Sequence, residues 1–153
     1  MLIILDIDGV MVTTPPWERQ EIMADGFPRF SDSAVESLSR ILSETGASIV
    51  LSTSHQSKFN ITEWKEIFKN RGVDVSSIQV TGALGGRSRK DEIMTWLNTH
   101  YHENIVIIDD DKSLNDLPTD IKEKCIIISP LIGLADTDAS EAIRILKTGP
   151  INT

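Results

Sequence analysis

The chain has 153 residues, of which 40% are hydrophobic and 25% are charged, and it carries a formal net charge of −8 at pH 7. The length favours one domain over residues 1–153, the composition is that of a globular protein, and the negative charge argues against broad electrostatic attraction to nucleic acid. No apolar run approaches the roughly 20 residues of a membrane span and no signal-like segment opens the chain, so we expect a cytoplasmic protein with no membrane partner.

The first ten residues place a short apolar strand directly before two carboxylates. Residues 2–5 are all apolar, without the alternation of a half-exposed strand, which predicts a strand of a parallel sheet that is covered on both faces. Asp6 and Asp8 follow it, and Gly9 lets the chain leave the strand sharply. Parallel sheets present function at the carboxyl ends of their strands, and two carboxylates this close repel each other, so the pattern indicates a divalent metal site.

The segment that follows has no clear periodicity. Residues 11–31 contain three prolines and a glycine, which predicts a loop or an irregular flap over the end of the first strand. Its aromatic residues are expected to pack it down; they are Trp17, Phe27 and Phe30.

The rest of the chain alternates helices and strands. Ser33 and Glu36 form a capping box for the first helix, and Thr62 caps the second. This alternation predicts a three-layer, Rossmann-like α/β fold with a five-stranded parallel sheet and right-handed crossovers. The expected helices cover about 34–45, 63–71, 90–98 and 137–147, and the expected strands cover 2–5, 48–51, 78–80, 105–108 and 125–128.

Polar side chains end three of these strands at what should be one edge of the sheet. Four carboxylates around one crevice repel one another and destabilise the fold unless a cation is bound. Ligands that are all oxygen select magnesium over zinc. A hydroxyl and a basic residue beside such a cation can hold phosphate oxygens, which leaves one carboxylate to attack phosphorus. The pattern therefore indicates a Mg²⁺ site that serves phosphoryl transfer. The residues are Asp6 and Asp8, then Ser52 and Thr53, then Asp109 and Asp110.

Two basic residues, Arg89 and Lys90, stand at the start of the helix expected at about 90–98. The helix dipole favours anions at this end, so we expect something negative to offset the repulsion. A bound phosphate would do so.

Taken in order, these residues resemble the motifs of the haloacid dehalogenase (HAD) superfamily of phosphohydrolases. The first motif of that superfamily, D-x-D-x-[TV] after an apolar strand, is similar to residues 6–10. The second, a Ser or Thr that closes the next strand, is similar to Thr53, with Ser52 as the alternative register.

The third and fourth motifs follow in the same order. The third is a lysine, for which Lys90 is our choice and Arg89 the rival. The fourth is an acidic pair after a strand, which is similar to Asp109 and Asp110. Four motifs in this order imply a HAD-like fold and a magnesium-dependent phosphatase.

The resemblance also implies a role for each residue. Asp6 would attack phosphorus and form an aspartyl-phosphate, and Asp8 would protonate the leaving oxygen and later activate water. Thr53 and Lys90 would hold phosphate oxygens. Magnesium would bind Asp6, the backbone carbonyl of Asp8, and Asp110, with Asp109 supporting or ligating.

The chain is most similar to the branch named for HAD domains of Swiss Army Knife RNA repair proteins. Shared features include residues 45–54 and the pair Gly133-Leu134. One departure follows the hydroxyl cluster, where the branch usually has Trp-Arg and this chain has His55-Gln56. His55 could reach substrate or be solvated.

The intervals between the motifs are short. Residues 11–47 and 54–89 have no room for a cap domain beside the flap, helices and strand expected there. The site is therefore expected to be open. An open site would admit bulky substrates such as nucleic-acid ends or phosphoproteins, unless a second copy of the chain covers it in a homo-oligomer. The expected partner is a phosphorylated substrate, either a small molecule or a nucleic-acid end.

The charge is unevenly distributed along the chain. Residues 54–90 hold seven basic and three acidic residues, a net of +4, which leaves −12 elsewhere. We consider two interpretations, a solvated helix face and a surface for the backbone of a nucleic-acid end. The residues proposed for backbone contact are Lys58, Lys65, Lys69 and Arg71.

Two other classes of protein use similar residues. A receiver-like phosphoacceptor module also has an acidic pair, a hydroxyl and a lysine, but keeps its acceptor Asp on a middle strand, where this chain has Ser52 and Thr53. A non-catalytic HAD-like domain with a binding or regulatory role is the second alternative. Repeated phosphate release would separate a phosphatase from both.

Overall fold

A computed structural model describes residues 1–13, 15, 17, 19–82, 88–100 and 104–148. Its centre is a five-stranded parallel sheet with the strand order β3-β2-β1-β4-β5. The central strand β1 pairs with β2 on one side, with Leu2 opposite Ser48, and with β4 on the other, with Leu2 opposite Ile105. The strands are β1 (Leu2–Leu5), β2 (Ser48–Leu51), β3 (Ile78–Val80), β4 (Ile105–Asp109) and β5 (Cys125–Ile127).

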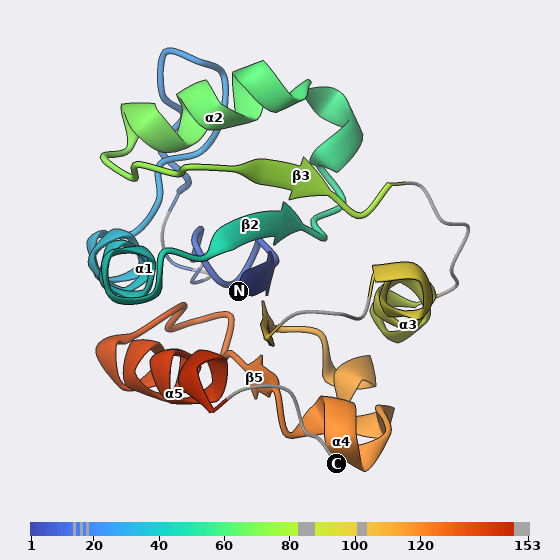
Figure 1. The fold of residues 1–153 in the computed structure, drawn as a ribbon. Coiled ribbons are helices and arrows are strands. Elements are labelled where there is room, and N and C mark those ends of the chain that lie inside the picture. Colours follow the sequence, from blue (N-terminus) through green and yellow to red (C-terminus); the bar gives the residue numbers. More distant parts are fainter. Residues whose placement is uncertain (14, 16, 18, 83–87, 101–103, 149–153) are drawn as a thin grey trace.

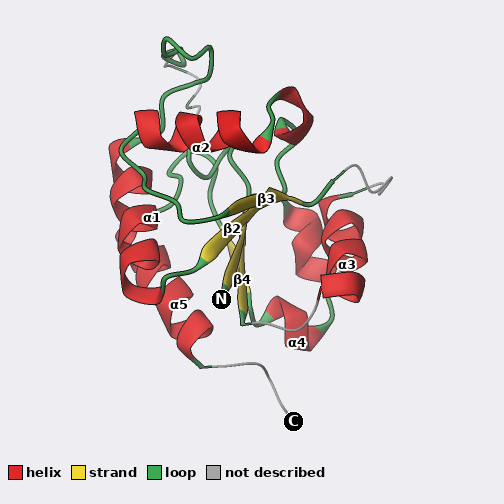
Figure 2. Ribbon diagram, turned by 45° about the horizontal axis from the view of Figure 1, so that its top comes forward, coloured by secondary structure: helices red, strands yellow, loops and turns green. Residues whose placement is uncertain are grey.

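Helices cover both faces of this sheet (Figures 1 and 2). Ile3 and Leu5 point into one core and Ile4 into the other, which is why β1 shows no polar alternation. The three-layer α/β fold is therefore confirmed. One face carries α1 (Asp32–Thr45), α2 (Ile61–Asn70) and α5 (Asp136–Lys147); the other carries α3 (Arg89–His100), α4 (Thr119–Lys122) and the 3-10 helix η2 (Lys112–Asp116).

Two helix starts differ from those predicted. Helix α1 begins after Ser31, whose hydroxyl accepts a hydrogen bond from the backbone of Ala34, so the predicted capping box of Ser33 and Glu36 is wrong. The hydroxyl of Ser33 instead donates to the carbonyl of Leu134. In both helices a polar residue two positions earlier than the predicted one makes the cap.

The cap of α2 shows the same shift. Asn60 accepts from the backbone of Glu63, and the Glu63 carboxylate accepts in return from the backbone of Asn60. The predicted Thr62 cap is therefore wrong, because this reciprocal pair satisfies two free backbone donors at once. A second 3-10 helix, η1 (Gln56–Lys58), lies between β2 and α2.

The segment before α1 is irregular, as predicted, and two of its three aromatic residues hold it down. Phe27 and Phe30 are buried, and the ring of Phe27 meets Trp64 edge to face at 5.5 Å between centroids. Trp17 is 76% exposed, so its predicted packing role is wrong. The apolar space beneath the segment is filled by Phe27 and Phe30, with their neighbours on α2.

Arg71, at the end of α2, ties this segment to the helix. Its side chain is 1% exposed and forms a salt bridge with Asp25. Its guanidinium also lies 5.0 Å from the centre of the Phe30 ring. All five of its N–H donors are used: Nε donates to the Pro28 carbonyl, Nη1 to Asp25 and the Ile67 carbonyl, and Nη2 to Asp25 and the Phe27 carbonyl. Arg71 therefore cannot contact nucleic acid as predicted.

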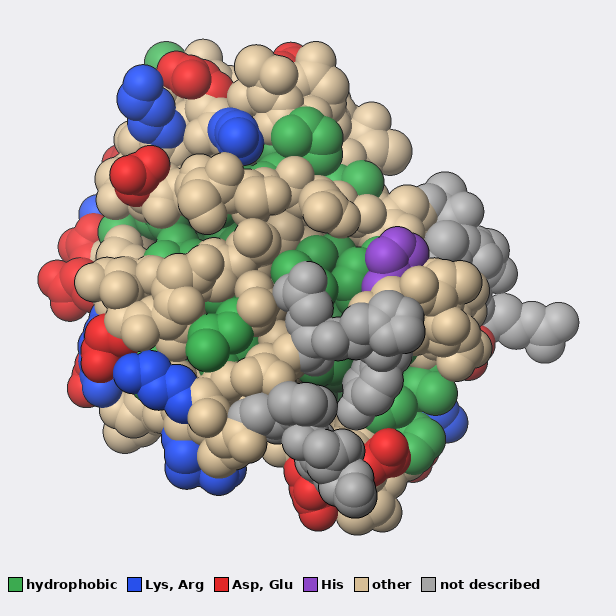
Figure 3. Space-filling view, in the orientation of Figure 1, with side chains coloured by type: hydrophobic (Ala, Val, Ile, Leu, Met, Phe, Trp, Pro, Cys, Tyr) green, Lys and Arg blue, Asp and Glu red, His purple; other side chains and the backbone are tan. Residues whose placement is uncertain are grey.

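Figure 3 shows one face of the molecule. Basic and acidic side chains both lie mainly toward its periphery, and neither kind forms a continuous patch on the described part of this face. In the described ranges of the chain, no helix combines the length and the apolar character needed to cross a membrane.

Candidate active site

The site lies at the carboxyl ends of β1 and β4, the two central strands. The connections from β1 and β2 cover one face of the sheet, whereas those from β3 and β4 cover the other, so the winding reverses between β1 and β4. A crevice forms at such a reversal and is the usual ligand site of these sheets. Asp6 follows β1 and Asp109 ends β4, so the topology brings the two acids together.

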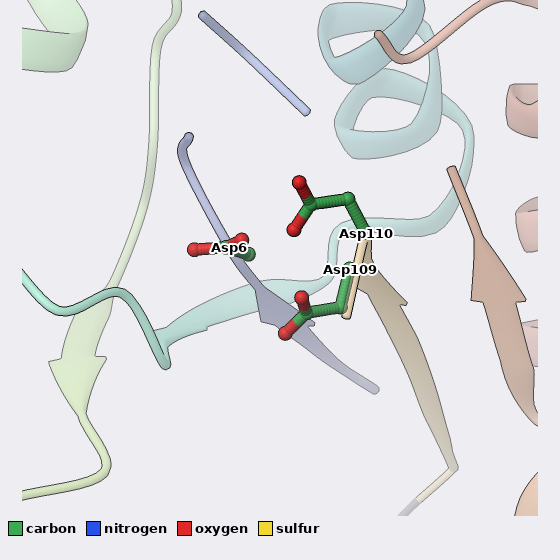
Figure 4. A group of neighbouring side chains, drawn as sticks. All are labelled: Asp6, Asp109 and Asp110. Atoms are coloured by element: carbon green, nitrogen blue, oxygen red, sulfur yellow. The ribbon is translucent and has the colours of Figure 1, made fainter. Parts of the chain in front are cut away.

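Three carboxylates converge there (Figure 4). Asp6, Asp109 and Asp110 each offer an oxygen, and these oxygens lie within 4.8 Å of one another. Asp109 is fully buried, Asp6 is 3% exposed and Asp110 is half-buried. Converging carboxylate oxygens are ligands that fit a hard divalent cation such as magnesium.

A guanidinium group lies against two of these acids. Arg89 is the first residue of α3, and its Nη1 lies 2.9 Å from Asp109 Oδ2 and 3.3 Å from Asp6 Oδ1. The same nitrogen donates to the hydroxyl of Ser52 at 3.2 Å. Arg89 therefore joins the ends of β1, β2 and β4 through one group.

Burial makes the charged form of this cluster unfavourable. It raises the pKa of Asp6, and the charge of Asp109 raises the pKa further, while Arg89 opposes both. Burial also raises the pKa of Asp109, again against the effect of Arg89. A cation bound here would offset this cost and would allow the acids to ionise together.

The family model described as the HAD domain in Swiss Army Knife RNA repair proteins matches residues 2–139. The chain belongs to this family. The matched range contains the three converging acids and Arg89, and it extends into α5. The branch predicted from the sequence is thus confirmed. A comparison with curated proteins finds no match.

The acid-base candidate of the HAD domain, Asp8, lies apart from the three converging carboxylates. Its side chain is 50% exposed, and its Oδ2 lies 2.7 Å from Nε2 of His55. The ligand group found among the described residues includes Asp6, Asp109 and Asp110 but not the Asp8 carboxylate. The predicted grouping of the Asp8 carboxylate with the other three acids is therefore not seen among the described residues.

The predicted phosphate-binding residues are placed differently from one another. Thr53 is fully buried at the end of β2, where its Oγ1 accepts a hydrogen bond from the backbone of His55 at 3.2 Å. Lys90 is half-exposed on α3, and its backbone donates to the hydroxyl of Ser113. Of the basic residues that the structure describes, Arg89 is the one whose side chain contacts both Asp6 and Asp109. The geometry therefore favours Arg89 over Lys90 for the third motif.

Gly9 fits against the site so closely that no other residue can replace it without movement. It has a φ of +80°, which L residues rarely adopt, and a Cβ added to it would lie 2.1 Å from Asp110 Oδ2. Because Gly9, which follows Asp8 in the first motif, has no side chain, the Asp110 carboxylate can lie directly against its backbone.

Reasoning from the sequence missed the contact between His55 and Asp8. The signal was the departure from the Trp-Arg pair of the family, because His55 and Gln56 replace it directly after the hydroxyl cluster. Gln56 also has a structural role: its side-chain carbonyl accepts from the backbone of Gly82 at 2.7 Å, which joins the ends of β2 and β3.

Proposed function

We propose that this HAD domain is a magnesium-dependent phosphomonoester hydrolase that acts through an aspartyl-phosphate on Asp6. The observation that carries the proposal is the cluster of buried Asp6 and Asp109 with half-buried Asp110, with the Arg89 guanidinium against the two buried acids. A nucleophile, a cation site and a fixed positive group then lie at one edge of the sheet. The order of the motifs in the family supports the same reaction.

The carboxylate of Asp6 attacks phosphorus, and the bond from phosphorus to the leaving oxygen breaks. Asp8 donates a proton to that oxygen, then accepts one from the water that cleaves the aspartyl-phosphate and releases phosphate. Asp6, Asp109, Asp110 and the Asp8 carbonyl would hold Mg²⁺. When bound, the cation neutralises charge on the transferring phosphoryl group and favours ionised Asp6.

Two groups are available to hold the phosphoryl oxygens. The Oγ1 of Thr53 accepts from the backbone of His55, so its hydroxyl proton can be donated to a phosphate oxygen. Arg89 supplies a guanidinium, which can bind two phosphate oxygens at once. Lys90, which is half-exposed on the same turn of α3, is the alternative for this role.

The test is release of phosphate from an aryl phosphate, with magnesium and with a chelator. Asp6→Asn should abolish turnover, and Asp8→Asn should let the aspartyl-phosphate accumulate because its hydrolysis needs a base. Asp116→Asn, at an exposed acid of η2, is the matched control. Activity that survives chelation would contradict the metal assignment, and near-normal turnover by Asp6→Asn would contradict the covalent mechanism.

The same assay separates the two alternatives. A receiver-like module would keep its phosphate after one turnover, and family membership already argues against it. A non-catalytic HAD-like domain would bind a phosphorylated ligand and release nothing.

For the substrate, we propose a phosphorylated nucleic-acid end. The family description names RNA repair proteins, and Lys58, Lys65 and Lys69 are exposed on η1 and α2, the elements that follow β2. Fewer positive charges of residues 54–90 are free to contact nucleic acid than the sequence suggested, because Arg71 and Arg89 form ion pairs with acids outside that range. The 3-10 helix η1, which ends at Lys58, follows β2 in the chain, whereas α2, which carries the other two lysines, runs back toward the opposite edge (Figure 1).

The substrate proposal predicts different results for two kinds of substrate. The pair Lys58→Glu and Lys65→Glu should raise KM for a phosphorylated oligonucleotide and flatten its salt dependence, with a slope change of about 0.7 to 0.9 per lost phosphate contact. An aryl phosphate should be almost unaffected. The control pair, Lys122→Glu and Lys147→Glu, makes the same charge change at the far ends of α4 and α5. Equal effects of both pairs would indicate a general field effect.

A further inference from the structure

The side chain of Asp8 is fixed by one contact to a residue that the family motifs do not include. Asp8 lies in the turn after β1, where the backbone of Gly9 donates to the carbonyl of Val12 at 2.8 Å. Its carboxylate is half exposed, and its Oδ2 lies 2.7 Å from Nε2 of His55. When Asp8 is ionised its carboxylate only accepts hydrogen bonds, so Nε2 of His55 then carries the proton in this pair.

The imidazole of His55 is itself held in place. Its backbone N–H donates to Oγ1 of Thr53, and its side chain is only 24% exposed. The ring of Phe27 meets it edge to face, with 5.5 Å between the centroids and an angle of 89°. His55 therefore has little freedom to turn away from Asp8.

Phe27 in turn is fixed by the irregular segment that Arg71 anchors. The ring is 3% exposed and packs edge to face on Phe59 and Trp64. Its carbonyl accepts a hydrogen bond from Nη2 of Arg71 at 2.8 Å. A continuous set of contacts thus runs from the buried guanidinium to the imidazole.

We propose that His55 is a positioning residue for Asp8 and that it holds the carboxylate through Nε2 in the orientation needed for proton transfer. This inference rests on the proposed hydrolase function of Asp6 and Asp8. A carboxylate that turns freely reaches the leaving oxygen or the attacking water in only a fraction of its orientations. Loss of the contact should therefore slow both proton transfers without weakening the binding of substrate.

The test compares two replacements of His55. His55→Phe keeps a ring against Phe27 but cannot donate, whereas His55→Gln keeps an N–H donor at the end of its side chain. We expect His55→Phe to lower kcat about 10-fold to 100-fold with KM within about twofold. We expect His55→Gln to recover most of the loss. His100→Phe is the control, because His100 also stacks on an aromatic residue, Trp96, but on α3.

The leaving group provides a second comparison. An alkyl phosphate needs protonation of its leaving oxygen more than a nitrophenyl phosphate does, so His55→Phe should affect the alkyl substrate more strongly. With the nitrophenyl substrate the aspartyl-phosphate should accumulate, because the hydrolysis of this intermediate becomes limiting. A change in folding alone would lower both rates equally.

Nitrogen-15 spectra of the histidine rings test the contact without turnover. Asp8→Asn should move the Nε2 resonance of His55 and leave that of His100 in place. If the wild type is active, either of two results would overturn the positioning role alone: an unchanged kcat in His55→Phe, or equal losses of kcat in His55→Phe and His55→Gln. An inactive wild type would overturn it together with the proposed function.

Discussion

Replacing Asp25 by alanine tests the anchor between the irregular segment and α2. Both carboxylate oxygens of Asp25 accept from Arg71, whose side chain is 1% exposed. Asp25→Ala leaves a buried guanidinium charge without its partner, which typically costs about 3 to 5 kcal/mol of unfolding free energy. In a chain of this length that corresponds to a fall in Tm of roughly 6 to 20 °C.

Urea unfolding at pH 7 measures this loss, with Asp32→Ala as the matched control. Asp32 pairs with Arg29 in the same part of the chain, but the two side chains are 82% and 47% exposed. An exposed pair of this kind contributes no more than about 1 kcal/mol. Equal losses in the two variants would refute the view that burial makes the Asp25 pair important.

The pH dependence provides an independent check. The hydrogen bonds from Arg71 hold the pKa of Asp25 well below its ordinary value of 3.8. A lowered pKa contributes stability that is present above the ordinary value and is lost as the pH falls below it. The difference between wild type and Asp25→Ala should therefore be constant from pH 5 to pH 7 and should shrink below about pH 4. A difference that grows in acid would contradict the assignment.

Three further predictions concern the acidic cluster and its neighbours. Burial raises the pKa of Asp6 from 3.8 to about 8, so in the presence of a chelator the free energy of unfolding should fall as the pH rises through this range. Mg²⁺ should therefore raise Tm more at pH 8 than at pH 5. Equal increases in Tm at the two pH values would argue against binding at this cluster. Gly9→Ala should displace Asp110 and weaken Mg²⁺ binding as measured by calorimetry, whereas Gly26→Ala, also at a positive φ but with open space around its Cβ, should leave the affinity unchanged. Arg89→Ala should lower kcat/KM about 100-fold or more by removing a charged donor from the phosphoryl group, and Lys90→Ala should lower it less than twofold; the reverse order would assign the third motif to Lys90.

The sheet could be predicted because its strands carry an unambiguous signal. Residues 2–5 and 105–108 are apolar without interruption, and both strands are buried on both faces of the sheet. The capping residues were harder to predict, because Ser31 and Ser33 offer similar hydroxyls two positions apart. Which of the two serines caps α1 depends on how the irregular segment before the helix packs against the rest of the protein. The helical turns at η2 and α4 were missed because each is too short to show a periodicity.

The acidic cluster could be predicted because parallel strands bring their carboxyl ends to one edge. Neither the choice between Arg89 and Lys90 nor the role of Arg71 follows from a sequence pattern. Arg89 points to the carboxylates because α3 begins beside β4, and Arg71 is buried because the segment around Asp25 folds over α2. Both depend on contacts between residues 20 or more positions apart in the chain.

The order of the strands also determines when the acidic cluster can form during folding. Strand β1 pairs with β2 across a loop of about 40 residues, but its pairing with β4 joins Leu2 to Ile105. Closing the longer loop costs more conformational entropy and makes this contact slow. We therefore expect the pairing of β1 with β4, which brings Asp6 to Asp109, to form after the pairing of β1 with β2. In that order the like charges would meet only when most of the apolar surface that offsets their repulsion is already being buried.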